Sequence, residues 1–201
     1  MRMKKIEIAA LLGIVAAVVI SSFGSFSAEC KGIRESVLRL HILANSDSDA
    51  DQALKLKVRD RILAETGETF NAPGKSQAEE QVRAHLDQIE AIAAAEIQAN
   101  GYDYPVKAEV TNMYFETRQY GDLTMPAGKY DAVRITIGEA KGHNWWCVLY
   151  PPMCVPAAMP KQEVEDVLTQ KQSGIVESNP KYEVRFAVVE AFEKLKNALF
   201  R

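Results

Sequence analysis

Residues 37–66 read VLRLHILANSDSDADQALKLKVRDRILAET, and this stretch decides the fold class. In its first eight residues, apolar side chains alternate with Arg39 and His41, which predicts a strand with one buried side and one solvent-facing side. Turn-forming residues at 45–48 end the strand. A helix follows, because Asp49 and Gln52 have capping-box spacing and apolar residues then recur at every fourth position, namely Leu54, Val58 and Ile62.

The same kind of pattern predicts the other elements. A long helix is expected over residues 76–99, with a buried stripe formed by Val82, Leu86, Ile89, Ala93 and Ile97. The apolar period then changes to two over residues 106–111, 133–137 and 145–150, which predicts a three-stranded antiparallel meander. Two helices complete the chain, at 161–172 and after Pro180, and the apolar face of the last one contains Val184, Val188, Phe192, Leu195 and Leu199. The order β-α-α-β-β-β-α-α predicts one α+β domain, a small antiparallel sheet with helices packed on it.

The first 27 residues have the pattern of an export signal. The basic segment MRMKK precedes an uncharged apolar run from Ile8 to Ile20, and the small residues Ser25 and Ser27 fit cleavage after Ser27. The apolar run is shorter than the roughly 20 residues that span a bilayer, and a retained anchor is the alternative. We therefore predict a signal peptide or N-terminal membrane anchor at 1–27 and one folded domain at 28–201.

Charge and motifs exclude several function classes. The chain of 201 residues has a net charge of −3, and because residues 1–27 sum to +2, the remainder sums to −5. Nucleic-acid binding requires a clustered basic surface, which this balance does not supply. The sequence also contains no G-x-S-x-G, H-E-x-x-H, P-loop, G-x-G-x-x-G or C-x-x-C motif.

Export would place the three cysteines in an oxidising compartment. Cys147 and Cys154 enclose a short loop turned by two prolines, and they are the candidates for a disulfide, with free thiols as the alternative. A zinc site would add His143, but this set lacks a fourth ligand and the usual short spacing. Cys30 is left over and is expected to lie unpaired near a mobile N-terminus.

Two stretches are richer in polar and aromatic residues than packing requires. The first runs from Arg39 to Asp60, and its candidate binding residues are His41, Asn45, Ser46, Asp47, Asp51, Gln52 and Lys55. The structural alternative is that the turn residues only form the turn and cap the helix. The second stretch, GHNWWCVLYPPMC at 142–154, contains Trp145 and Trp146 on opposite faces of a strand, so that one indole is exposed unless both faces are covered.

Two other interpretations of these residues stay open. The acidic residues at 47, 49 and 51 have the alternation of a calcium loop, but the glycine and the distal glutamate of an EF-hand are missing. A hydrolytic site would use His41, Asp47 and His143, which requires the two histidines to converge. This second interpretation predicts an exported hydrolase or wall-associated enzyme.

The runs LHILANSDSDADQALKLKVRD (40–60) and YGDLTMPAGKYDAVRITIGEAKGHNWWCVLYPPMC (120–154) resemble the stage II sporulation protein R family of endospore-forming bacteria. The resemblance extends from about Val37 to Cys154, and the export segment agrees with it. It implies a protein made in the forespore and exported into the space between the forespore and mother-cell membranes. There it would activate a membrane-embedded aspartic-type protease that processes pro-sigma-E.

The resemblance also implies what the chain lacks, and together with the expectation that the first strand and the tryptophan strand are neighbours it indicates a contact surface. We expect no catalysis of its own, no cofactor or metal, and neither nucleic acid nor a small-molecule substrate as a partner. The expected contact surface contains the turn 45–47, the first turn of the helix that follows, and one of Trp145 and Trp146.

Overall fold

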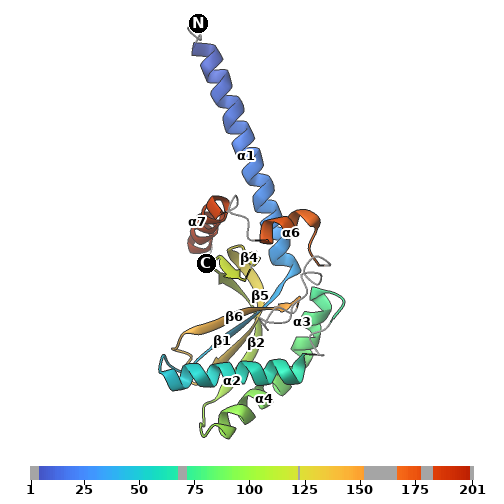
Figure 1. Cartoon of the computed structure of the whole chain (residues 1–201), viewed down its shortest axis with the longest axis vertical. Coiled ribbons are helices and arrows are strands. Elements are labelled where there is room, and N and C mark those ends of the chain that lie inside the picture. The colour runs from blue at the N-terminus through green and yellow to red at the C-terminus, as the bar shows by residue number, and fades with distance from the viewer. Residues whose placement is uncertain (1–4, 68–71, 122, 152–166, 178–182, 200–201) are drawn as a thin grey trace.

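The computed structural model describes residues 5–67, 72–121, 123–151, 167–177 and 183–199, and it has the α+β architecture that the sequence predicts (Figure 1). A long N-terminal helix leads directly into the first strand of a mixed sheet, and helices cover both faces of that sheet. The helices are α1 (Lys5–Ser36), α2 (Asp49–Thr66), α3 (Lys75–Ala84), α4 (Leu86–Ala99), α6 (Gln170–Val176) and α7 (Glu183–Leu199). The strands are β1 (Leu38–Leu43), β2 (Val106–Phe115), β3 (Arg118–Tyr120), β4 (Leu123–Met125), β5 (Gly128–Ile137) and β6 (Asn144–Tyr150).

The strand order corrects the predicted meander. The main sheet has the order β2-β5-β1-β6, and β3 and β4 form a separate two-stranded hairpin. β2 pairs with β5 in antiparallel fashion as expected, but β6 pairs with β1 instead of β5. β1 therefore lies in the centre of the sheet, parallel to β5, and the sheet is mixed and not wholly antiparallel. Periodicity identified these strands but contains no information about which strands pair.

The first face of the sheet confirms most of the predicted core. Helices α2, α3 and α4 pack on this face through apolar stripes (Figure 1). The predicted residues of α2 are all buried, and the predicted stripe of α3 and α4 is buried apart from half-buried Leu86. The predicted helix over 76–99 is divided at His85, whose backbone leaves the helical region at φ −118°.

The second face differs from the prediction, because it is covered as well. The end of α1, the hairpin β3–β4, α6 and α7 build a second apolar cluster on it. Arg39 and His41, predicted to face solvent, are therefore buried. Both tryptophans are half-buried: Trp145 packs with the first cluster and Trp146 with the second. Neither indole is fully exposed, whereas one of them would be exposed if only one face of the sheet were covered.

Three local expectations for helices compare with the structure as follows. Ser48, one residue before the expected cap, is the N-cap of α2, and its hydroxyl accepts from the Asp51 backbone N–H. The first half of the helix predicted over 161–172 lies outside the described residues, and in the described half α6 begins at Gln170. In α7 the predicted apolar face is exposed, and Phe186, Val189 and Glu193 face the domain instead.

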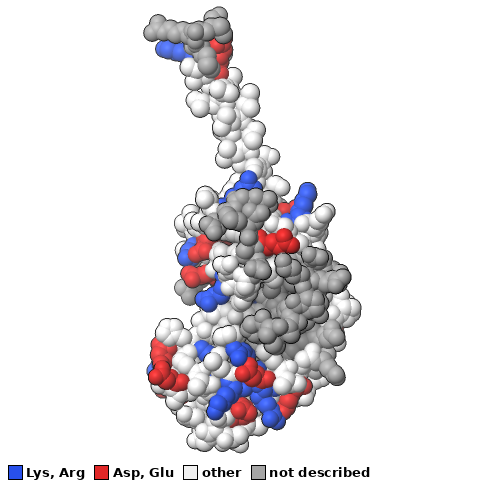
Figure 2. Space-filling model, in the orientation of Figure 1, with Lys and Arg blue, Asp and Glu red and all other residues white. Residues whose placement is uncertain are grey.

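Helix α1 is long and apolar enough to cross a membrane, by length and composition. Its first part projects from the domain as a rod, and Figure 2 shows that this rod has charged side chains only near its start. Its last turns belong to the second cluster, where Phe26, Cys30 and Ile33 are buried. Cys30 is thus a buried free thiol within a helix and not part of a mobile terminus.

Candidate interaction site

Polar side chains and tight loops gather where β1 and β5 end and β6 begins. The group is formed by residues 44–48 after β1, residues 51–55 of α2, and the β5–β6 connection at 138–144, and we call it the polar rim. Because β1 and β5 are parallel, their carboxyl ends meet at one edge of the sheet, which brings the first and third segments together. The rim lies at the start of α2, away from the projecting part of α1 (Figure 1).

Asp51 organises the first of these segments. Its carboxylate accepts hydrogen bonds from Asn45 Nδ2 at 2.9 Å and from Ser46 Oγ at 2.5 Å. These two bonds, from Ser46 first, lower the pKa of the buried Asp51 carboxyl below its ordinary value. The negative charge of Asp51, stabilised by hydrogen bonds from Asn45 and Ser46, therefore holds the turn in place.

Asp47 and Lys55 connect the turn to the β5–β6 connection. One carboxylate oxygen of Asp47 accepts from the His143 backbone N–H at 2.5 Å and contacts Nδ1 of the same residue. The backbone bond is the main reason that the pKa of Asp47 is lowered. Lys55, a candidate binding residue, is buried and donates to the His143 carbonyl at 2.8 Å and to Gln52 Oε1 at 2.6 Å. Burial lowers the pKa of Lys55.

Glycines allow the two loops to approach this closely. Gly138 has φ +58°, and a Cβ there would lie 2.2 Å from Asn45 Oδ1, which accepts from the Glu139 N–H. A Cβ on Gly142 would lie 2.1 Å from the Ser46 carbonyl oxygen. The sequence analysis missed residues 138–141 as part of this site, and the closely spaced glycines were the available signal.

A second polar group is buried on the other face of the sheet. The guanidinium of Arg39 lies 4.3 Å from the Phe115 ring centroid and 4.9 Å from that of Tyr130, and it donates to the Tyr120 hydroxyl. The His41 ring lies 4.5 Å from that of Trp146. Within the described residues, two guanidinium nitrogens of Arg39 and both ring nitrogens of His41 have no hydrogen-bond partner. No sequence pattern indicated this arrangement, because it depends on the covered second face.

The structure separates the residues of the hydrolase interpretation. Asp47 and His143 are paired at the rim with exposed side chains (55% and 80%), whereas His41 is buried against Trp146. The described ranges contain no group of three or more acidic, histidine or cysteine side chains that could hold a metal ion, so the calcium spacing does not produce such a site there. Cys147 is buried in β6, and the predicted disulfide stays a prediction because Cys154 lies outside the described residues.

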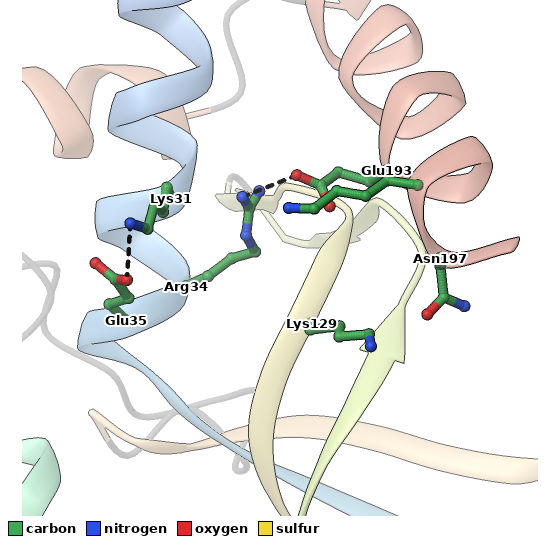
Figure 3. A pocket seen from close by; sticks show the side chains of 7 residues that line it. Lys31, Arg34, Glu35, Lys129, Glu193 and Asn197 are labelled. Atoms are coloured by element: carbon green, nitrogen blue, oxygen red, sulfur yellow. Dashed lines mark hydrogen bonds and ion pairs between the residues drawn. The ribbon is translucent and has the colours of Figure 1, made fainter. Parts of the chain in front are cut away.

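A pocket of about 220 Å³ lies apart from the rim, between α1, β5 and α7 (Figure 3). Arg34 reaches from α1 toward Glu193 of α7, and their side chains form a buried ion pair of 3.1 Å. Lys31, Glu35, Lys129, Lys196 and Asn197 also line this pocket. Arg34 also donates to the Ala127 carbonyl at 2.9 Å, so its main role is to join α1 to the domain.

The rim lies inside the part of the chain that matches a known family. The sequence profile of Stage II sporulation protein R matches residues 34–160, which is more than half of the chain. The chain belongs to the stage II sporulation protein R family. The profile covers β1 through β6 and the polar rim, and it leaves out α6, α7 and nearly all of α1.

A curated member of the family is also similar to this chain in sequence. The Stage II sporulation protein R of Bacillus subtilis (strain 168) is 40% identical over 123 residues, which are 61% of this chain and 55% of that protein. The match therefore spans about half the length of the relative. No solved structure matches the chain.

Proposed function

We propose that this member of the stage II sporulation protein R family is an exported signalling protein that activates a membrane-embedded protease of the aspartic type. The protease would process pro-sigma-E, and the signal would couple gene expression in the forespore to that in the mother cell. Membership of the family carries this proposal. The chain itself would act by binding, without catalysis of its own.

The polar rim is the proposed contact surface for the protease. It contains most of the residues selected from the sequence, lies within the family match, and offers exposed acceptors and donors from Asp47 and His143. His41 and Trp146 are separate from it, because they pack on the other face of the sheet. Trp145 packs beside α2, with the Arg59 guanidinium 4.2 Å from its ring centroid.

The position of the rim supports a signal between two facing membranes. If α1 enters the forespore membrane, the rim lies at the end of β1 opposite to the end that follows α1 (Figure 1). The domain would then present the rim across the intermembrane space to a partner in the mother-cell membrane. Figure 2 shows acidic side chains at the edge of the molecule where α2 begins, and charges at a contact of this kind would set orientation and encounter rate.

The proposal is tested by reconstitution. The full chain and the candidate protease are placed in separate vesicle populations that are then brought into contact, and the conversion of pro-sigma-E is followed on gels. The proposal expects conversion only when the chain is present, and co-purification of the two proteins after solubilisation. Conversion at the same rate without the chain would contradict it.

A further inference from the structure

The described chain exposes large apolar side chains in two helices, α1 and α7. Those of α1 belong to the candidate membrane span. Those of α7 form a stripe that we call the α7 seam, and they are 47% to 75% exposed: Val184, Val188, Phe192, Leu195 and Leu199. At 100° per residue the five side chains fall within an arc of about 80°. A continuous exposed apolar surface of this kind marks an interaction site.

The direction of α7 excludes a bilayer surface as the cover of the whole seam. The Phe186 ring centroid lies 5.4 Å from that of Phe26, and seven residues later Glu193 pairs with Arg34 of α1. The partners in α1 are eight residues apart, so the two helices run side by side in the same direction (Figure 3). The seam therefore extends away from any membrane that α1 crosses, and a bilayer surface would reach only its first turn.

The spacing of the seam indicates a helix as its partner. The steps of four, three and four residues from Val188 through Phe192 and Leu195 to Leu199 are those of the a and d positions of a two-helix contact. The arc is also narrower than the apolar face of about 100° or more that a helix presents to a broad core.

The charges beside the seam favour a parallel pair of identical helices. Lys196 lies on one flank of the seam, and the small residues Ala187, Ala191 and Ala198 lie on the other flank. In a parallel two-fold pair, the lysine flank of one helix faces the alanine flank of the other helix, so the aliphatic stem of each Lys196 lies over alanines. An antiparallel pair would instead place the two copies of Lys196 on the same side. Copies anchored in one membrane through α1 share one orientation, which permits only the parallel pair.

We propose that the α7 seam pairs in parallel with the same seam of a second copy of this chain. The five side chains offer on the order of 500 Å² per copy, so the pair buries roughly 1,000 Å², the lower bound for a specific interface. The seam also lies outside residues 34–160, which separates it from the surface that the family shares. The dimer does not depend on the proposed function.

The test uses the full chain in detergent and in vesicles. Sedimentation in detergent is expected to give a dimer, and the double variant Phe192→Glu and Leu195→Glu is expected to weaken it at least tenfold. Both side chains are exposed, so circular dichroism and thermal melting should be unchanged. The matched control, Leu11→Ala and Val15→Ala in the exposed part of α1, should leave the dimer intact.

Cross-linking tests the parallel arrangement. A Leu195→Cys variant in vesicles should form a disulfide-linked dimer on mild oxidation, whereas Asp60→Cys, exposed on α2, should not. A monomeric wild-type chain at tens of micromolar would overturn the proposal. Unchanged dimerisation of the glutamate variant would overturn it as well. If the wild-type chain is monomeric and the glutamate variant still loses pro-sigma-E processing, the seam binds another protein and the proposal is also overturned.

Discussion

The most informative single residue is His41, because its burial reverses the interpretation that the alternating pattern suggested. Burial, with smaller contributions from the charges of Arg134 and Arg39, lowers the pKa of His41 to about 4. An unfolded histidine titrates near pH 6.5, so between pH 6.5 and 4 the unfolded chain binds more protons than the folded chain. Folding stability is therefore complete above pH 6.5 and is lost as the pH falls toward 4.

We expect His41 to remove about 3 kcal/mol of unfolding free energy between pH 7 and pH 4. The His41→Phe variant should lose this part of the pH dependence, as measured by urea unfolding at a series of pH values. Ile42→Val is the matched control in β1, because it lowers stability by about 1 kcal/mol without removing a titrating group and should shift the curve in parallel. An equal slope in His41→Phe and wild type would contradict the assignment.

Gly142 tests the close contact of loops at the polar rim. A Cβ at this position would meet the Ser46 carbonyl oxygen at 2.1 Å, and backbone cannot rotate away as a side chain can. Gly142→Ala is expected to cost about 1–3 kcal/mol in urea unfolding, as other overpacked sites do. Gly174→Ala in α6, with no atom within 4 Å of its Cβ, should instead be neutral or slightly stabilising. Equal effects of the two substitutions would refute the contact.

At the scale of elements, periodicity predicted the four strands of the main sheet and helix α2, but it missed the hairpin β3–β4 and the break between α3 and α4. Leu54, Val58 and Ile62 are buried as α2 requires, since one helix face follows directly from spacing. Strand pairing does not follow from spacing, and neither does a second covering layer. The alternating pattern therefore predicted Arg39 and His41 to face solvent, and both are buried because the second face is covered.

Helix α1 continues through Ser27, where the sequence suggested cleavage. Phe26, just before that bond, is buried against Phe186, so cleavage would remove part of the second cluster. We predict that α1 is retained, and that the intact mass of protein from spore-forming cells includes residues 1–27. Phe26→Ala should destabilise the domain by about 3–5 kcal/mol, and Phe23→Ala, which is half-buried, by less. A mature protein that begins at Ala28 would show that the anchor is removed.

The Arg34–Glu193 ion pair holds α7 against α1, and both side chains are 9% exposed. Glu193→Gln leaves the buried guanidinium without a compensating charge, so we expect a loss of about 3 kcal/mol in thermal or urea unfolding. The double variant Arg34→Met and Glu193→Met should lose less, because no charge then stays buried. Glu35→Gln, in the exposed pair with Lys31, is the control and should change stability by under about 1 kcal/mol. A double variant worse than Glu193→Gln would contradict this account.

At the scale of the whole molecule, one chain combines a candidate membrane span, a sheet covered on both faces and a polar rim at the end of β1 opposite to α1 (Figure 1). The family match covers the sheet and the rim, and the α7 seam lies outside it. The proposed roles are therefore protease activation for the rim and self-association for α7. These two roles can be separated by mutation, since no residue belongs to both surfaces.

Activation of the protease by rim variants that remain folded tests whether the rim contacts the protease. Asp47→Ala removes the carboxylate that joins the turn to His143, and Asp60→Ala removes an exposed carboxylate from α2 outside the rim. Pro-sigma-E conversion is measured with both full-length variants, and melting temperatures are recorded alongside. The account predicts at least tenfold slower conversion with Asp47→Ala, unchanged conversion with Asp60→Ala, and similar melting temperatures for both. Full activation by folded Asp47→Ala would contradict the claim that the rim contacts the protease.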